Sequence, residues 1–448
     1  MSNREKMNKA LDMAGQTKAA EISQGALKRT PELFKKFFPG EKAIIITDTN
    51  TWKAAGEAAY EIMNADGVDC AKFIIPDKDF HAEWKYIEMI EGVLKEADAI
   101  AVAVGSGVIN DVCKLSAHRL GKRYMSIASA ASADGYSSSG AAIVYQGSKQ
   151  TFACPAPLVI VADVDVLCNA PARLTIAGYA DLAAKVPAGA EWMIADLFGT
   201  EPIIPDAWHV LQDDLDDMLA DPQGIAERKP DAVAALFEGL TLSGVSMQIA
   251  GGSSRPLSCA DHLYSHILDM THHTFEGRPQ LHGFQVAVGT MTMCAFFDEL
   301  FKLDLSKLDV DKCVAAWPTL EQEQKRALEL FKDFPVPQLG YEEITKKWQS
   351  PDEVRVQLTR VKENWPDFKA KLQGQVYTFE KMQNMFRLAG APTDPSQIGV
   401  SRERLKADTN LVQLMRWRIN LFDLAKRAGI FDTLVGGVFG KGGAWEIQ

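Results

Sequence analysis

The sequence lacks several features that mark secreted, membrane-embedded or nucleic-acid-binding proteins. The first thirty residues contain no continuous apolar run, so we expect no secretory signal peptide. No stretch approaches the roughly 18 consecutive apolar residues of a membrane span, and we predict no membrane partner. Positive charge is in deficit, since 48 Lys and Arg face 59 Asp and Glu, a net charge of −11. This balance argues against nucleic acid as a partner, because such binding needs a cationic surface.

Paired cysteines are also lacking. The seven cysteines are an odd number, lie far apart and include no C-x-x-C pair, which predicts neither a disulfide framework nor a thiolate zinc site. We therefore expect a cytoplasmic protein. The 448 residues, 47% hydrophobic and 24% charged, are typical of a globular chain and long enough for two or three domains of about 150 residues each.

What the first part of the chain contains is a series of short apolar runs separated by helix-compatible stretches. The runs cover 42–47, 70–75, 99–104, 124–127 and 158–161. Because they do not alternate with polar residues, they predict strands buried on both faces of a mostly parallel sheet. Residues 141–152 predict a β-hairpin beside that sheet, with its turn at 146–148.

From Pro171 onward the periodicity is helical. The predicted fold is therefore an α/β nucleotide-binding lobe, residues 1–169, followed by an all-α lobe, residues 170–448, that would bind metal and substrate. We expect small molecules to bind in a cleft at the boundary of the two lobes. The charged, Trp-rich segments 206–232 and 302–365 predict insertions or peripheral helices.

Two polar segments follow predicted strands. Gly105-Ser-Gly-Val-Ile-Asn-Asp111 opens a helix, where backbone N–H groups can hold a phosphate, or where the glycines simply make a tight turn. The pattern departs from G-x-G-x-x-G, and Asp48 precedes the glycines rather than following them. Residues 129–138 are rich in small hydroxylated side chains around Asp134 and form either a ligand-facing wall or an ordinary loop.

The histidines cluster strongly. Five of the eight fall between 262 and 282. His262 and His266 share one face of a predicted helix, and His282 opens the apolar helix 284–296. The pair His272-His273 precedes a polar turn and is expected at the surface.

A metal site needs a further ligand besides two histidines. Asp181 is a single carboxylate among small apolar residues on a predicted helix, and burying it without a partner would be costly. It either joins histidines of this cluster at a metal ion or pairs with Lys185 one turn later on its own helix. The residues alone leave both arrangements open.

Taken together and in order, these segments resemble the sn-glycerol-1-phosphate dehydrogenases, in the AraM-like branch of the iron-containing alcohol dehydrogenase superfamily. The resemblance spans roughly residues 40–300 and one late helix. It is carried by 105–111 with Lys114, 129–135, 155–165, 177–185, 252–256, His262-Leu-Tyr-Ser-His266, Leu281-His-Gly283 and, more weakly, 415–424.

The resemblance implies a dehydroquinate synthase-like fold and a metal-dependent enzyme that interconverts dihydroxyacetone phosphate and sn-glycerol 1-phosphate with NAD or NADP. It implies that Asp181, His262 and His282 bind one divalent ion, Zn²⁺ or Ni²⁺, and that Asp134, Asp181 and His266 contact substrate, with Asp181 and His266 catalytic. The implied cofactor contacts are Asp48, Gly107, Val108, Ile109, Asn110, Asp111, Ser129, Ala130, Ala131, Ser132 and Ser138.

Further expectations follow from this resemblance. Arg255 and Lys185 are the nearest cationic residues for the phosphate of a three-carbon substrate. Asp48 at a strand end favours NAD over NADP, because a carboxylate accepts hydrogen bonds from ribose and repels a 2′-phosphate. A homodimer is expected. The alternatives are a glycerol or other polyol dehydrogenase of the same superfamily and a nucleotide-binding relative without catalysis.

Overall fold

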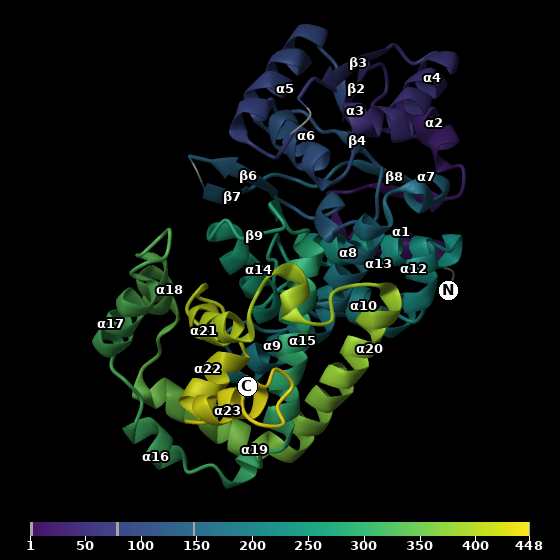
Figure 1. Cartoon of the computed structure of the whole chain (residues 1–448). Coiled ribbons are helices and arrows are strands. Elements are labelled where there is room, and N and C mark those ends of the chain that lie inside the picture. The colour runs from purple at the N-terminus through teal and green to yellow at the C-terminus, as the bar shows by residue number, and fades with distance from the viewer. Residues whose placement is uncertain (1–2, 78–79, 147, 448) are drawn as a thin grey trace. The chain divides into compact units, whose positions relative to one another are not determined.

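A computed structural model of the chain describes residues 3–77, 80–146 and 148–447 (Figure 1). The chain divides into two compact units, each made of two stretches: residues 1–182 with 205–257, and residues 183–204 with 258–448. We refer to them as the first and the second unit. They do not follow the predicted boundary after residue 169, because residues 170–182 and 205–257 belong with the sheet-containing part of the chain.

The first unit contains a six-stranded sheet in which every neighbouring pair is parallel, in the order β1-β8-β5-β4-β2-β3. The strands are β1 (Ala19–Ser23), β2 (Ala43–Asp48), β3 (Cys70–Ile75), β4 (Ile100–Gly105), β5 (Met125–Ala128) and β8 (Val159–Asp163). Five of them are the predicted apolar runs. The predicted hairpin is also present as β6 (Ala141–Tyr145) and β7 (Ser148–Phe152); its turn residue Gly147 lies outside the described residues.

The helices of the first unit cover both faces of this sheet (Figure 1). Ile45 and Val102 pack with α2 (Thr30–Phe37) and α4 (Glu57–Ala65). Ile44 and Ala101 point to the opposite face and pack with α5 (Trp84–Ala97) and α6 (Gly107–Arg119), because successive strand residues alternate in direction. Burial on both faces explains why these strands lack polar alternation.

The order of the strands creates a switch point. The chain runs from β2 outward to β3 and then crosses to β4 on the other side of β2, after which β5 and β8 extend the sheet in that direction. In open parallel sheets, ligands bind outside the carboxyl ends of the strands at such a point. Asp48 ends β2 and Gly105 ends β4, so both residues lie at this position.

Residues 205–257 belong to the first unit because α13 (Pro230–Ile249) packs on its N-terminal helix. Leu242 and Val245 of α13 share an apolar cluster with Met7, Ala10 and Leu11 of α1 (Asn3–Ala14). By length and composition α13 is the one helix in the described ranges that is apolar enough to cross a membrane, and 78% of its most apolar window is buried inside the protein. Further helices of this unit are α3 (Thr49–Thr51), α7 (Val164–Asn169), α8 (Ala172–Ala183), α10 (Pro205–Gln212), α11 (Leu215–Met218) and α12 (Pro222–Glu227).

The second unit is mainly helical. It consists of α9 (Lys185–Phe198), α14 (Ala260–Met270), α15 (His282–Phe301), α16 (Val310–Ala315), α17 (Leu320–Phe331), α18 (Leu339–Lys347), α19 (Pro351–Gln375), α20 (Phe379–Ala389), α21 (Arg402–Val412), α22 (Leu421–Arg427) and α23 (Phe431–Phe439). Helix α15 packs against α14, and Gly289 permits this contact because a Cβ there would lie 2.1 Å from the carbonyl oxygen of Asp261.

The structure corrects two expectations about strands. The edge strand β1 was not predicted, and the C-terminal part is not entirely helical, because β9 (Thr274–Phe275) and β10 (Arg278–Pro279) form a short antiparallel hairpin. Its turn residues Glu276 and Gly277 have φ values of 53° and 73°, the left-handed geometry of a tight hairpin turn. All seven cysteines lie in the described ranges, and none forms a disulfide bond.

Candidate functional site

The predicted cofactor residues gather at the carboxyl edge of the sheet. The β2–β4 register, continued by two residues, sets Asp48 level with Gly105, and Gly105 pairs with Ala128 of β5. The Ser129 N–H donates to the Gly105 carbonyl oxygen at 3.0 Å. Gly105 must lack a side chain, because its Cβ would lie 2.5 Å from Ile109 Cγ1. Helix α6 then begins directly at Gly107, and no other atom lies within 4 Å of a Cβ placed there.

The Asp48 side chain caps helix α3. Its Oδ1 accepts the N–H groups of Asn50 and Thr51 at 2.7 and 2.8 Å, which caps α3. The backbone N–H of Asp48 in turn donates to the Thr51 hydroxyl at 3.1 Å, which completes a capping box. The side chain is half-buried, and its position at the strand end suits the proposed ribose contact.

Within the glycine segment, several side chains hold protein atoms rather than face a ligand. Ile109 and Asn110 are buried, and Asn110 Nδ2 donates to the Gly135 carbonyl oxygen at 3.0 Å. Asp111 pairs with Lys114 at 3.3 Å and accepts the Ala142 N–H at 3.2 Å. Cofactor contacts in this segment would therefore come mainly from the backbone and from Gly107 and Val108, which are half-buried.

Lys114 fixes the loop that carries the other predicted contacts. Its ammonium group is buried and donates to the carbonyl oxygens of Gly135, Ser138 and Gly140 at 2.9, 3.0 and 2.9 Å. The Ser138 hydroxyl donates to the Asp134 carbonyl oxygen at 2.9 Å. Three charge-assisted hydrogen bonds from one lysine hold residues 135–140 in a single conformation.

The same loop reaches Asp181. The Asp134 N–H donates to Asp181 Oδ2 at 3.0 Å, and the Asp134 carboxylate accepts the Ser243 hydroxyl at 3.1 Å. Gly178, one turn before Asp181 on α8, permits this approach, because a Cβ there would lie 2.0 Å from the Ala131 carbonyl oxygen. Ala130 and Ala131 are both buried.

Asp181, His262 and His282 form the cluster in the described part of the chain that could hold a metal ion. Their ligand atoms all lie within 4.8 Å of one another. Asp181 and His262 are buried, and His282 is half-buried. One carboxylate and two imidazoles are a donor set suited to a divalent transition metal, with positions left for substrate.

Hydrogen bonds set the tautomer of both imidazoles. His262 Nδ1 lies 2.6 Å from Asp261 Oδ2, and a carboxylate only accepts, so Nδ1 carries the proton. Asp261 is itself fixed by the Cys259 N–H, which donates to Oδ1 at 3.0 Å. The Nε2 lone pair of His262 is then the one that a metal would use.

His282 is oriented in the same way. The Ser265 hydroxyl donates to Gln285 Oε1 at 2.7 Å, so its oxygen accepts from His282 Nδ1 at 3.0 Å. His282 therefore also keeps Nε2 unprotonated. Since both imidazoles offer the same atom and each has an outer partner, the residues present fit a divalent ion. Asp261, Ser265 and Gln285 were not among the predicted site residues.

The beginning of α14 is held by a buried glutamate. Glu191 of α9 accepts the Ala260 N–H at 2.9 Å and the Leu421 N–H at 2.7 Å, and so joins the starts of α14 and α22. Burial raises the pKa of Glu191 to about 7. The helix that carries His262 is thus anchored two residues before the histidine.

The other three histidines of the 262–282 cluster lie outside the Asp181–His262–His282 group. His266 is half-buried, and its Nε2 lies 3.3 Å from Arg416 Nη2. His272 is exposed, whereas His273 is half-buried and contacts the Ile398 carbonyl oxygen at 2.7 Å. Lys185 and Arg255, the expected phosphate contacts, are 0% and 1% exposed.

Comparisons with known proteins agree with this fold. Residues 21–171 match the iron-containing alcohol dehydrogenase family. Over most of their length, the solved structures of maleylacetate reductase from Rhizobium sp. strain MTP-10005 and of sulfoacetaldehyde reductase from Bifidobacterium kashiwanohense in complex with NAD⁺ have the same fold. The maleylacetate reductase has a TM-score of 0.58 at 15% identity, and the match covers 93% of this chain and 95% of that one. The sulfoacetaldehyde reductase has a TM-score of 0.53 at 12% identity, and the match covers 93% of this chain and 96% of that one.

The chain belongs to the iron-containing alcohol dehydrogenase family. Within it, the similar curated proteins are glycerol-1-phosphate dehydrogenases [NAD(P)⁺]. The one from Methanothermobacter thermautotrophicus is 30% identical over 56% of this chain and 70% of its own length. The one from Geobacillus thermodenitrificans is 28% identical over 86% and 85%. For the one from Halalkalibacterium halodurans, 30% identical over 56% of this chain, the match spans just under two thirds, 64%, of its length.

Proposed function

We propose that this chain is a metal-dependent oxidoreductase that interconverts dihydroxyacetone phosphate and sn-glycerol 1-phosphate with NAD(H) or NADP(H). The observation that carries the proposal is the cluster of Asp181, His262 and His282 with both imidazoles held in the Nδ1–H tautomer. The glycerol-1-phosphate dehydrogenases among its relatives support the choice of substrate. A cytoplasmic homodimer and a preference for Zn²⁺ or Ni²⁺ belong to the same proposal.

The residues of the cluster and the bound cofactor would have separate roles in the reaction. Asp181, His262 and His282 would hold the divalent ion, which, when bound, supplies Lewis-acid stabilisation of negative charge on the substrate's C2 oxygen. A bound nicotinamide cofactor would supply the hydride for C2 of dihydroxyacetone phosphate, or accept it from glycerol 1-phosphate, while the proton of the C2 hydroxyl would be held or moved by the chain's own residues.

The protein's own groups position the reactants. The edge formed by Asp48, Gly107–Asp111 and Ser129–Ser132, with Ser138 on the adjoining loop, would receive the cofactor, because the N-terminus of α6 opens there beside the switch point of the sheet. Asp134 would contact substrate from beside Asp181. His266, one helical turn after His262, would bind the substrate or transfer the hydroxyl proton.

The test is NADH and NADPH oxidation by purified protein, first depleted of metal and then loaded with Zn²⁺, Ni²⁺, Fe²⁺ or Mn²⁺. Dihydroxyacetone phosphate and dihydroxyacetone are offered separately, and glycerol 1-phosphate, glycerol 3-phosphate and glycerol are tested in the reverse direction. We expect turnover only with metal and a strong preference for the 1-phosphate. Equal or better turnover of the unphosphorylated substrates would favour a polyol dehydrogenase and reject the proposal.

A further inference from the structure

Arg416 lies against the predicted catalytic histidine. It belongs to residues 413–420, the segment that joins α21 to α22, and its Nη2 lies 3.3 Å from His266 Nε2. A guanidinium group has only donors, so His266 Nε2 accepts this hydrogen bond and remains unprotonated. The contact spans 150 positions in the sequence and brings a permanent positive charge to the histidine-rich helix α14.

In the described part of the chain no carboxylate lies within ion-pair distance of Arg416. Neighbouring arginines differ, since Arg418 pairs with Glu201 at 3.7 Å, Arg402 with Asp394 at 2.7 Å and Arg404 with Asp408 at 3.5 Å. Burial is the main cause of a lowered pKa at Arg416, which shows that its charge is poorly solvated. A desolvated cation without a counter-ion is costly, and an incoming anion would relieve that cost.

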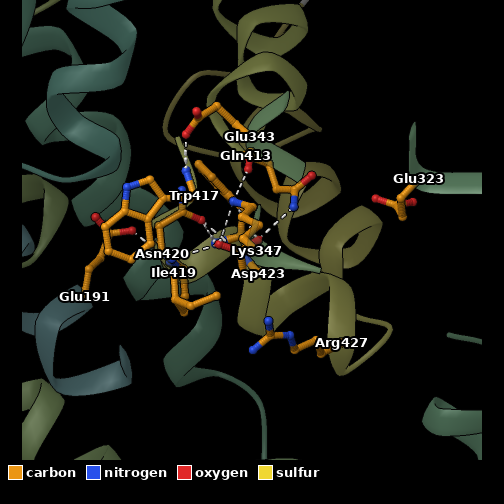
Figure 2. Close-up of polar contacts among 12 residues, drawn as sticks. Glu191, Glu323, Glu343, Lys347, Gln413, Trp417, Ile419, Asn420, Asp423 and Arg427 are labelled. Carbon is orange, nitrogen blue, oxygen red and sulfur yellow. Dashed lines mark hydrogen bonds and ion pairs between the residues drawn. The ribbon is translucent and has the colours of Figure 1, made fainter. Parts of the chain in front are cut away.

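The segment that carries Arg416 is fixed by buried polar contacts (Figure 2). At its beginning, the buried Lys347 donates to the Gln413 carbonyl oxygen and contacts the Asp423 carboxylate at 3.0 Å. At its end, the Asn420 N–H donates to Asp423 Oδ2 at 2.9 Å. Both ends of the segment are therefore tied to one buried ion pair.

The middle of the 413–420 segment is also held by hydrogen bonds. The Trp417 N–H donates to Glu343 Oε2 at 2.6 Å (Figure 2). Because Trp417 directly follows Arg416, α18 holds the backbone next to Arg416. The Gln413 side chain donates to Asp423 Oδ1 at 2.8 Å. Because this backbone is already ordered, little conformational entropy would be lost when Arg416 binds an anion.

The position suits a short phosphorylated substrate. His266 follows the proposed ligand His262 by four residues, a rise of about 6 Å along the helix. In a three-carbon phosphate, the phosphate joins C2 through one carbon and one oxygen, a span of the same order. A substrate whose C2 lies by the His262 end of α14 would thus bring its phosphate to the His266 end, where Arg416 lies.

We infer that Arg416 binds the phosphate group of the substrate and thereby sets the preference for phosphorylated over unphosphorylated three-carbon compounds. The inference rests on the proposed function and names a residue for its substrate selectivity. Arg416, which contacts His266, takes the place of Arg255 and Lys185 as the proposed phosphate contact.

The experiment compares Arg416→Gln and Arg416→Lys with the wild-type holoenzyme and with Arg418→Gln, a control in the same segment whose arginine has a carboxylate partner. We expect Arg416→Gln to lower kcat/KM for dihydroxyacetone phosphate by at least about 30-fold, mainly through KM, and to change it for dihydroxyacetone by less than about threefold. Arg416→Lys retains the positive charge, so its kcat/KM for dihydroxyacetone phosphate should fall less than that of Arg416→Gln. Arg418→Gln should keep the wild-type ratio between the two substrates.

A second readout does not need turnover. Titration calorimetry of the metal-loaded protein with inorganic phosphate should show binding that Arg416→Gln weakens by at least about tenfold. Wild-type protein that binds phosphate but reduces no dihydroxyacetone phosphate would reject the proposed function and leave Arg416 as an anion site. Equal losses for both substrates, equal losses in Arg418→Gln, or phosphate binding unchanged in Arg416→Gln would each overturn the assignment of Arg416.

Discussion

The contact between α14 and α15 gives a quantitative test of the metal site, because these helices carry His262 and His282. A Cβ built on Gly289 would lie 2.1 Å from the Asp261 carbonyl oxygen, whereas ordinary contact begins at 3.4 Å. Gly289→Ala must therefore separate the two backbones by about 1.3 Å, the difference between these distances. Metal–ligand distances tolerate only about 0.2 Å, so a displacement of this size should disrupt coordination.

We expect Gly289→Ala to cost about 1–3 kcal/mol of unfolding free energy through overpacking and to raise the Zn²⁺ dissociation constant by at least about tenfold. Chelator competition measures the affinity, and urea unfolding measures the stability. The matched control is Gly374→Ala near the end of α19, where no atom lies within 4 Å of the new Cβ. That variant should be neutral or stabilised by up to about 1 kcal/mol. A Gly289→Ala protein with wild-type metal affinity would refute the argument.

Four further outcomes are expected. Asp181→Asn should give a folded, cofactor-binding but metal-poor and nearly inactive protein, and one tightly bound metal per chain with near-native turnover would show that Asp181 is structural. His262→Ala should lose metal by elemental analysis while His266→Ala keeps it and loses turnover; the same metal content in both would contradict their separate roles. Asp48→Ser retains a cap for α3 and should narrow the ratio of NAD to NADP kcat/KM, which an unchanged ratio would disprove. Burial raises the pKa of Glu191 from 4.5 to about 7, so between these pH values the folded apoprotein keeps a proton that the unfolded chain releases. The free energy of unfolding should therefore fall as pH rises, by up to about 1.4 kcal/mol per pH unit. Glu191→Gln, compared with wild type by unfolding at pH 5 and 7.5, should lack this pH-dependent loss of stability.

The central strands could be predicted because burial on both faces leaves a clear pattern, as at Ile44–Ile46. The edge strand β1 could not, since Glu21 stands at its centre and its other residues are only half-buried. Glu21 is satisfied by contacts with Arg4 and Arg29, which no local pattern shows. Periodicity thus finds strands enclosed by helices and misses those at an edge.

In the candidate site, the spacing of the histidines and the resemblance identified the cluster that the structure brings together at Asp181. The residues that orient it were missed. Asp261 lies off the helix face that His262 and His266 share, yet its carboxylate contacts the Nδ1 of its immediate neighbour His262. Arg416, the proposed phosphate contact, was not predicted because its contact with His266 is distant in sequence. The available signal was an arginine with no acidic residue three or four positions away.

The interleaving of the two units along the chain has a consequence for how the protein is made. Ser23 pairs with Asp163, 140 positions later, which at 5–20 residues per second means that β1 leaves the ribosome about 7–28 s before its partner strand. The apolar face of α1 stays uncovered longer still, because its partners Leu242 and Val245 on α13 are synthesised much later in the chain. During synthesis the apolar face of α1 and the free edge of β1 therefore stay uncovered until α13 and β8 have been made, although β2 to β5 are synthesised in the meantime.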